Sequence, residues 1–268
     1  MIDKLTDKVY FSSFLKSYKC WTMIERALSE RGIAFELLEH TRDVWVRDFM
    51  PIQTDNRRFV GYDYSPDYLN DLPKFITRYD ECMPFRPKEL VQSGVRLDGG
   101  NFVACGDCAL MTDKVLKENH VEDTLTFMRR LEELFQTEIT LIPWDHSERF
   151  GHADGMVRYL GDGRVLINNY RDYDADFGTA VKEALKGLFE IQELRYGKLN
   201  QSENTWAYLN FLRVGDTLMV PELGYKSDKP AFRQLADAHP SCEIVPIPMR
   251  SIVKQGGGLN CISWNIKY

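Results

Sequence analysis

The feature that most constrains the fold of this chain is a recurring order of short strands, tight turns and amphipathic helices. Three pairs of strand-like segments are separated by short turns that contain Gly and Asp, a pattern typical of β-hairpins. They are residues 102–104 with 109–111, 156–160 with 165–168, and 207–212 with 217–220. Further strands are expected at residues 8–11, 34–38, 59–62 and 244–247.

Apolar residues at helical spacing lie between these strands. They predict helices over residues 15–28, 121–135, 177–189 and 231–238. Strands that alternate with helices normally indicate an α/β protein with parallel strands, whereas the hairpins add antiparallel pairs. The sequence therefore predicts an α/β fold in which hairpin, helix and strand repeat, although no residue-level periodicity accompanies this candidate repeat.

Length, net charge and hydropathy limit the number of domains, the kind of partner and the expected location of the protein. No linker-like segment interrupts the 268 residues, which predicts one domain over residues 1–268. The net charge of −6 and the absence of a Lys/Arg run argue against a nucleic-acid partner, and an acidic protein suits a cationic substrate. The N-terminus lacks the pattern of a signal peptide and no apolar stretch approaches membrane-spanning length, so we expect a cytoplasmic protein without membrane contact.

Six scattered cysteines are typical of reduced thiols rather than of a disulfide framework. They are Cys20, Cys82, Cys105, Cys108, Cys242 and Cys261. Cys105 and Cys108 form a CxxC motif, but no second CxxC or Cys/His pair completes a four-ligand zinc set, and the intervening Gly-Asp favours a hairpin turn. We therefore predict no metal and no cofactor.

Two segments in the first half of the chain contain a carboxylate in a distinctive setting. In residues 45–51, Asp48 lies between large apolar residues where a strand is expected to end. It either caps the following turn or pairs with Arg47, or it serves a ligand. In residues 97–101, Asp98 precedes two glycines, which either form an ordinary Asp-Gly turn or allow the backbone to approach a ligand closely.

His152 and Asp154 are two residues apart in the segment Gly-His-Ala-Asp-Gly. In an extended conformation both side chains point to the same face, which places an acid/base group beside an anion. The carboxylate would raise the pKa of the imidazole and keep a proton available near neutral pH. The alternative is a surface histidine with an incidental aspartate.

A glycine-rich loop leads into the last cysteine of the chain. Gly256, Gly257 and Gly258 precede Cys261, which is followed by an apolar strand. Glycines lack β-carbons, so a substrate can lie close to the backbone beside the thiol. The alternative for any single cysteine is a buried, unreactive thiol.

Taken together and in this order, the motifs resemble the agmatine deiminase-like branch of the guanidino-modifying enzymes, which includes arginine deiminases and peptidylarginine deiminases. The resemblance covers nearly the whole chain. The matching segments are Arg47-Asp48, Asp98-Gly99-Gly100-Asn101, Gly151-His152-Ala153-Asp154 and Gly256-Gly257-Gly258-Leu259-Asn260-Cys261. Residues 207–211, followed by Val220-Pro221, also resemble the strand that precedes the last blade in this family.

The resemblance implies the pentein fold, a five-bladed α/β propeller of ββαβ units with the active site on its central axis. Three features depart from the family pattern. Asp98 stands where Glu is usual, Asn260 stands where agmatine deiminases often have His, and the Met-Pro-x-Glu-Trp-like opening is absent. These departures leave the exact guanidine substrate open.

The chemistry that the resemblance implies is hydrolysis of a small agmatine- or arginine-like guanidine, with release of ammonia through a covalent S-alkylthiouronium intermediate. Cys261 would be the nucleophile and His152 the acid/base. Asp48 and Asp154 would clamp the guanidinium, and Asp98 would orient His152 from behind.

Other residues near the motifs are candidates to line the substrate pocket, although hydrophobic packing explains the aromatic ones equally well. Those implied to bind substrate beside the two clamp carboxylates are Trp45, Arg47, Gly257 and Gly258, and further pocket candidates are Trp144, Glu148, Arg149 and Phe150. We expect a monomer or a homodimer.

Two alternatives from other classes remain open at this point. A propeller that keeps the scaffold can bind a guanidine or a protein partner without catalysis, because a fold does not guarantee an activity. A Cys/His hydrolase of the thiol protease type would leave Asp48 and Asp154 without a role.

Overall fold

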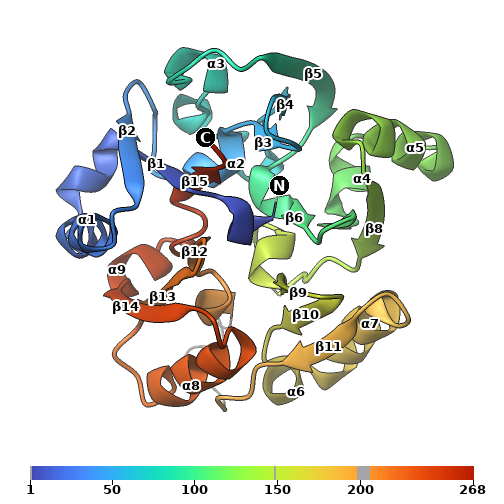
Figure 1. Cartoon of the computed structure of the whole chain (residues 1–268). Helices are drawn as coiled ribbons and strands as arrows, with labels where there is room; N and C mark the ends of the chain where they lie inside the picture. The colour runs from blue at the N-terminus through green and yellow to red at the C-terminus, as the bar shows by residue number, and fades with distance from the viewer. Residues whose placement is uncertain (1, 148, 198–205) are drawn as a thin grey trace.

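The computed structural model of the chain describes residues 2–147, 149–197 and 206–268. Within these residues the strands form five three-stranded sheets, which are arranged as blades around a common centre (Figure 1). In each blade the central strand pairs antiparallel with one neighbour and parallel with the other. The five-bladed α/β propeller of ββαβ units that the sequence implied is confirmed.

The blades follow one another along the chain. The first contains β15 (Ser263–Ile266), β1 (Lys8–Ser12) and β2 (Ala34–Leu38), and the second β3 (Ile52–Gln53), β4 (Arg58–Asp63) and β5 (Glu89–Arg96). The third contains β6 (Val103–Ala104), β7 (Cys108–Thr112) and β8 (Glu138–Ile142), and the fourth β9 (Val157–Gly161), β10 (Arg164–Ile167) and β11 (Glu190–Glu193). The fifth contains β12 (Leu212–Val214), β13 (Thr217–Glu222) and β14 (Glu243–Pro248).

Helices connect the two parallel strands of each blade, because a parallel pair requires a crossover connection. These helices are α1 (Cys20–Glu30), α3 (Tyr79–Cys82), α5 (Thr124–Phe135), α7 (Ala175–Leu185) and α8 (Asp228–Ala238). In Figure 1 they lie at the periphery of the ring. Shorter helices are α2 (Val46–Phe49), α4 (Lys114–Glu118), α6 (Tyr170–Tyr173) and α9 (Arg250–Val253), with 3-10 turns η1 (Asp3–Leu5), η2 (Ser13–Ser17), η3 (Asp67–Leu69), η4 (Pro73–Phe75), η5 (Gly99–Asn101) and η6 (Ala153–Gly155).

The boundaries of the predicted helices differ from the structure where local capping intervenes. Residues 13–17 form a separate 3-10 turn, in which the Ser12 hydroxyl accepts the N–H of Phe14, so α1 begins at Cys20 rather than at residue 15. The Asp123 side chain caps α5 by accepting the N–H of Thr126, which starts that helix after residue 121. Helix α7 ends at Leu185, four residues earlier than predicted.

Two of the three predicted hairpins are confirmed, and the third is wrong in its first strand. The pairs β6–β7 and β9–β10 are antiparallel hairpins, as expected. Strand β12 begins only at Leu212, and residues 206–208 form a 3-10 turn. The N–H of Asn210 bonds to the carbonyl groups of Trp206 and Ala207 instead of a neighbouring strand. This turn brings the Asn210 side chain to the centre of the molecule.

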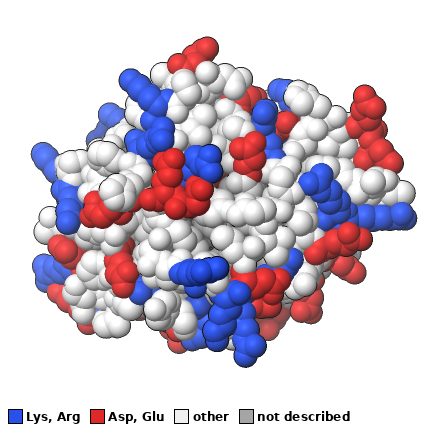
Figure 2. Space-filling model, turned by 90° about the horizontal axis from the view of Figure 1, so that it is seen from above, with Lys and Arg blue, Asp and Glu red and all other residues white. Residues whose placement is uncertain are grey.

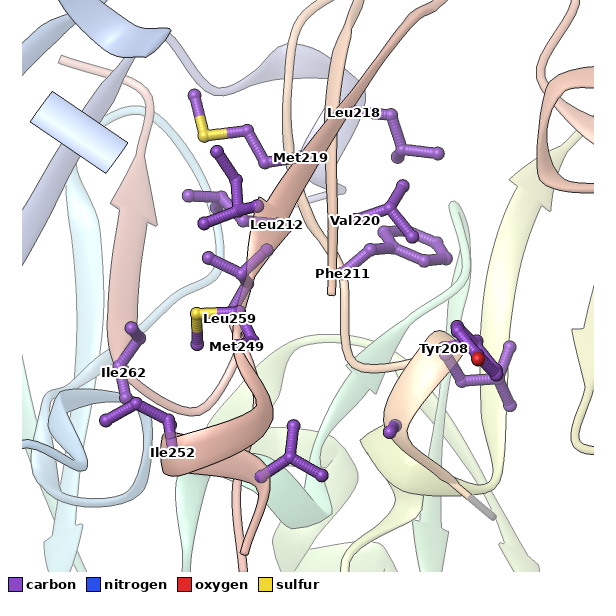
Figure 3. Close-up of a cluster of buried hydrophobic side chains, with 14 of the residues drawn as sticks. Tyr208, Phe211, Leu212, Leu218, Met219, Val220, Met249, Ile252, Leu259 and Ile262 are labelled. Carbon is purple, nitrogen blue, oxygen red and sulfur yellow. The ribbon is translucent and has the colours of Figure 1, made fainter. Parts of the chain in front are cut away.

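The central strands are almost completely buried, as expected for strands covered on both faces. All five residues of β1 are buried, whereas the first four residues of the outer strand β2 alternate between exposed and partly buried and only Leu38 at its end is buried. Figure 3 shows the apolar cluster around the fifth blade, in which Leu259 and Ile262 are fully buried. These two residues lie on either side of Cys261 in the sequence, so the same cluster anchors the loop that carries the thiol.

Strand β15 closes the ring. It pairs antiparallel with β1, in the register Phe11 with Ser263 and Lys8 with Ile266, so the last strand of the chain completes the first blade. Cys261 lies two residues before this strand, and its position is fixed by the closure of the propeller.

The outer surface carries charges of both signs. On the face seen in Figure 2, acidic and basic side chains are interspersed. No helix in the described residues is long and apolar enough to cross a membrane.

Candidate active site

The predicted site residues come from separate segments that meet at the centre of the propeller. Asp48 lies in α2, Asp98 directly precedes η5, His152 directly precedes η6, Asp154 lies in η6 and Cys261 precedes β15. All five side chains are buried, with at most 8% of each residue exposed. The structure therefore brings together five residues from four segments that are far apart in the sequence.

Two local expectations for these segments are wrong. Asp48 was expected where a strand ends, but it lies in the single helical turn of α2, which the Tyr62 hydroxyl fastens by donating to the carbonyl groups of Asp48 and Met50. His152 is extended, but Asp154 lies in a 3-10 turn, so the two side chains do not share one strand face. Asp154 faces the nucleophile loop instead.

His152 is held between two carboxylates. Its Nε2 lies 2.8 Å from Asp98 Oδ2 and its Nδ1 lies 3.6 Å from Asp48 Oδ1. The Tyr68 hydroxyl donates to the same Asp98 oxygen at 3.1 Å. Asp98 therefore reaches the imidazole although it is one methylene shorter than the Glu usual in the family.

Burial and charge act in opposite directions on His152. Burial lowers the pKa of the imidazole, but the nearby carboxylates of Asp48 and Asp98 outweigh it and raise this pKa above its ordinary value. Burial raises the pKa of Asp48, and Asp98 and Asp154 act in the same direction against the opposing effect of His152. The imidazole thus keeps its proton near neutral pH.

The second glycine of the Asp-Gly-Gly motif, Gly100, is required by its close packing against His152 and Asp48. A β-carbon on Gly100 would lie 2.7 Å from His152 Nδ1 and 2.8 Å from Asp48 Oδ1, closer than carbon atoms approach such groups. The backbone N–H of Gly100 also donates to Asp48 Oδ1 at 3.2 Å. The glycine allows Asp48 and His152 to approach each other.

Backbone contacts from the third blade position His152. The Thr112 hydroxyl, at the end of β7, donates to the carbonyl of Gly151 at 2.6 Å, and the Thr112 N–H donates to Asn101 Oδ1 at 2.8 Å. Gly151 has a φ of +71°, which favours glycine, and a β-carbon there would lie 2.6 Å from the Lys114 and Trp144 side chains.

Asp154 contacts the thiol and two amides. Its Oδ2 accepts a hydrogen bond from Asn260 Nδ2 at 2.6 Å and from Asn210 Nδ2 at 3.4 Å. Cys261 Sγ lies 3.9 Å from the same oxygen. Asn260, which departs from the family pattern, therefore holds the carboxylate next to the thiol.

Asn210 organises the loop before Cys261, and the sequence analysis missed this role. Asn210 Oδ1 accepts the N–H of Gly258 at 3.0 Å and that of Cys261 at 3.1 Å. A β-carbon on Gly258 would lie 2.8 Å from this oxygen, and one on Gly257 would overlap the Trp45 ring. Packing inside the protein thus requires these two glycines.

A cavity of about 500 Å³ leads from the surface to the site, and we call it the front cavity. Its wall includes Asp48, His152 and Cys261 at the inner end. The predicted pocket residues Trp45, Arg149 and Phe150 line it, as do Phe14, Tyr18, Asp43, Tyr64, Tyr68, Leu69, Leu72, Phe75 and Gly256.

Some predicted pocket residues lie elsewhere. Among the described residues, Asp154, Arg47, Trp144, Gly257 and Gly258 are not part of the wall of the front cavity, and Glu148 lies outside the described residues. Asp154 instead lines a narrow extension of the site together with His152 and Cys261. Arg47 points away from this cavity, with Nε donating to the Asn260 carbonyl at 3.3 Å and Nη2 bonded to Asn265 Oδ1.

Burial raises the pKa of the Cys261 thiol well above its ordinary value, and the charges of Asp154 and Asp48 add to this effect. The thiol is therefore protonated near neutral pH when no cationic ligand is bound. A cation that neutralises both carboxylates would remove their contribution to the raised pKa of Cys261.

The other cysteines are not arranged around a metal. All six are free, and Cys105 and Cys108 lie in the β6–β7 hairpin turn, where Gly106 has a φ of +83°. No group of His, Cys, Asp and Glu side chains in the described part of the chain is arranged to hold a metal ion.

Comparisons with known proteins agree with this architecture. The family model described as Porphyromonas-type peptidyl-arginine deiminase matches residues 16–266. The agmatine deiminase of Stutzerimonas stutzeri is 23% identical over 275 residues, which cover 82% of this chain and 73% of that protein.

Two solved structures have the same fold. The structure of C. jejuni agmatine deiminase has a TM-score of 0.76 and 19% identity, covering 100% of this chain and 95% of that one. The structure of DDAH from Pseudomonas aeruginosa, complexed with citrulline, has a TM-score of 0.65 and 14% identity. The match covers 98% of this chain and 100% of that one. The resemblance stated from the motifs is confirmed, as is the pentein fold it implied.

The packing around Gly100 predicts that Gly100→Ala moves His152 away from Asp48 and lowers the activity of the protein. A rough expectation is a hundredfold loss of kcat, because small misplacements of reacting groups are that costly. Thermal unfolding of the same variant reports whether the fold is retained. Gly163→Ala is a control for the effect of lost stability alone, since its φ of +70° strains an alanine whereas a built β-carbon has nothing within 4 Å. It should lower the unfolding temperature and leave kcat unchanged. Unchanged activity in folded Gly100→Ala would show that the close approach is not needed.

Proposed function

Because the chain belongs to the Porphyromonas-type peptidyl-arginine deiminase family, we propose that it hydrolyses the guanidinium group of a small agmatine- or arginine-like compound and releases ammonia. One observation supports this proposal most strongly. A buried thiol lies 3.9 Å from the carboxylate of Asp154, while a second carboxylate, Asp48, lies 3.6 Å from the imidazole of His152 at the inner end of the same site. Such an arrangement suits a planar cation that must be attacked at carbon.

Asp48 and Asp154 are proposed to clamp the guanidinium. Each carboxylate can accept charge-assisted N–H bonds from the planar cation, which fix its orientation as well as its position. The raised pKa of Asp48 supports this role, because a buried carboxylate without enough positive charge is stabilised when a cation binds.

Binding of the substrate would also activate the nucleophile. The same two carboxylates contribute to the raised pKa of Cys261, so a guanidinium that neutralises them favours the thiolate. The thiol proton leaves to water, and the thiolate then attacks the guanidinium carbon to form a tetrahedral intermediate. Specificity for a cation and activation of the thiol are therefore coupled in this mechanism.

His152 would move the protons of both half-reactions. As the imidazolium it protonates the departing nitrogen, the C–N bond breaks and ammonia leaves, which gives the S-alkylthiouronium on Cys261. The neutral imidazole then takes a proton from a water that attacks the same carbon, and the C–S bond breaks. As the C–S bond breaks, the hydroxyl proton of the adduct reprotonates the Cys261 thiolate. The products are a ureido compound and ammonia, which together with the proton that the thiol released to water account for the guanidinium and one water.

Asp98 would act through His152 as a positioning residue. Its Oδ2 accepts from both His152 Nε2 and the Tyr68 hydroxyl, which fixes the plane of the imidazole. The charge of Asp98 also contributes to the raised pKa of His152.

The proposal extends to the setting of the enzyme. Residues 1–268 would act as one catalytic domain in the cytoplasm, as a monomer or homodimer, on a small cationic guanidine and without nucleic acid. The net charge of −6 and the interspersed surface charges support a small cationic substrate over a polyanion (Figure 2).

The test is a product assay on a panel of guanidines that includes agmatine, arginine and N-methylated arginine. We expect at least one compound to give ammonia, or an alkylamine, together with an equal amount of ureido product. Cys261→Ser should abolish turnover, because a serine hydroxyl is too weakly acidic to replace the thiolate. Cys242→Ser is the matched control, since Cys242 does not line the front cavity. Binding of guanidines without any product would instead identify a non-catalytic binding protein.

The contact between Asp98 and His152 predicts a shift in the pH dependence of the reaction. His152 must carry a proton, so activity falls as the pH rises through its pKa, and removing the charge of Asp98 lowers that pKa. Asp98→Asn should therefore move the alkaline limb of the kcat/KM profile to lower pH by about one unit or more. Asp98→Glu should keep the limb near that of the parent, and Asp107→Asn, which removes an exposed charge in a hairpin turn, should not move it. An unmoved limb in Asp98→Asn would show that Asp98 only shapes the turn.

A further inference from the structure

A second cavity lies on the other side of Asp154, and we call it the rear cavity. It has a volume of about 80 Å³ and shares none of its lining residues with the front cavity. Asp154 and Asn260 form part of its wall, together with residues of η1 at the start of the chain. The rear cavity is therefore separate from the path by which a guanidine would reach Cys261.

Three arginines line the rear cavity. Arg47 comes from α2, Arg158 from β9 and Arg213 from β12, so three different parts of the propeller contribute one guanidinium each. Arg158 and Arg213 are buried, at 3% and 6% exposed. Such a concentration of buried cations is costly unless anions compensate for it.

The carboxylates of the rear cavity do not balance this charge. Asp3 pairs with Arg158, and Asn265 Nδ2 donates to Asp3 at 3.2 Å. Burial raises the pKa of Asp3, but the charges of three arginines, Arg158, Arg47 and Arg213, outweigh it and lower this pKa. One carboxylate therefore interacts with three cations. The other carboxylate in the wall, Asp154, faces the thiol and is already bonded to Asn260 and Asn210.

The guanidinium groups also keep donors available. Each carries five N–H donors in a planar fork. Among the described residues, Arg47 donates to the Asn260 carbonyl and to Asn265, Arg158 donates to Asp3, and Arg213 donates to the Gly215 carbonyl at 3.0 Å. These four bonds leave most of the fifteen N–H donors of the three guanidinium groups without a protein acceptor among the described residues.

We propose that the rear cavity is a binding site for a small oxyanion such as inorganic phosphate. Guanidinium forks are the side chains best suited to bind phosphate or carboxylate oxygens. A water needs about 10–15 Å³ of such a volume, so the cavity has room for an ion of this size. The anion would balance the excess charge and accept the donors that Arg47, Arg158 and Arg213 direct into the cavity.

The experiment is isothermal titration calorimetry of the whole chain with phosphate, sulfate and acetate, at constant ionic strength set with chloride. We expect saturable one-site binding of at least one of these ions. Binding of phosphate or sulfate but not acetate identifies a tetrahedral anion, and the reverse identifies a carboxylate. No saturable binding of any of the three at concentrations up to about 20 mM would overturn the proposal.

Arg213→Gln tests the site directly. Among the described residues, the Arg213 guanidinium donates a hydrogen bond only to the Gly215 carbonyl, so the substitution removes little other than the charge. The Kd for the anion should rise about tenfold or more, the cost of one charge-assisted hydrogen bond. Arg26→Gln, which removes an exposed arginine on α1, is the matched control and should leave the Kd unchanged. Equal Kd values for Arg213→Gln and the parent would contradict the proposal.

Two further measurements separate this site from the guanidine site and from a folding defect. Agmatine added to Cys261→Ser should not displace the anion, and displacement would place the anion in the front cavity and overturn the assignment. If Arg213→Gln does not fold, as judged by thermal unfolding, Arg213→Lys keeps the charge but loses the planar fork. That variant should bind the anion more weakly than the parent, and unchanged affinity would refute the role of Arg213.

Discussion

The arrangement of this molecule depends on three buried carboxylates that converge on one imidazole and one thiol. Asp48 and Asp98 lie on the two sides of His152, and Asp154 lies beside Cys261. Mutual repulsion and burial make this cluster costly, as the raised pKa of Asp48 indicates. In the proposed mechanism, the same repulsion favours binding of a cationic group and couples that binding to formation of the thiolate.

The propeller supplies the rigidity that holds such a cluster together. Each site residue lies in a short turn beside a blade rather than within a regular strand, and each turn is fastened by hydrogen bonds from another part of the chain. Tyr62 fastens α2, Thr112 holds the Gly151 carbonyl and Asn210 holds the loop before Cys261. Antiparallel pairing of β15 with β1 closes the ring directly after the thiol, so the nucleophile is positioned by the last step of closure.

The parts of this structure that the sequence predicts are those set by local patterns. Strand-like segments between Gly- and Asp-containing turns indicated the central strands, and apolar residues at helical spacing indicated the four longer outer helices, with errors at the ends where caps such as Asp123 intervene. The order of the four motifs located the buried carboxylates, the imidazole and the thiol. Their roles in catalysis follow from chemistry and stay proposals.

The parts that the sequence analysis missed are set by contacts between distant segments. Asn210 was assigned to a strand, yet its side chain bonds to Cys261, 51 residues further along the chain. Arg47 was expected to bind substrate, but its guanidinium bonds to Asn260 and faces the rear cavity. Gly257 and Gly258 were expected beside the substrate, and instead they make room for Trp45 and Asn210. The direction in which each of these side chains points cannot be predicted from the spacing of residues in the sequence. In a helical turn or a loop, that direction depends on which distant segments pack against it.

The central claim is that Asp48 and Asp154 select a planar cation and thereby favour the thiolate of Cys261. The most direct measurement compares the rates at which 2-chloroacetamidine and its neutral counterpart 2-chloroacetamide alkylate Cys261, followed by peptide mapping over all six cysteines. The cationic reagent should label Cys261 about a hundredfold faster than the neutral one, and Asp48→Asn and Asp154→Asn should each remove most of this preference. Labelling of Cys20, Cys82 and Cys242 should show no such preference. Equal rates at Cys261 for the two reagents, or a preference that both variants retain, would contradict the account.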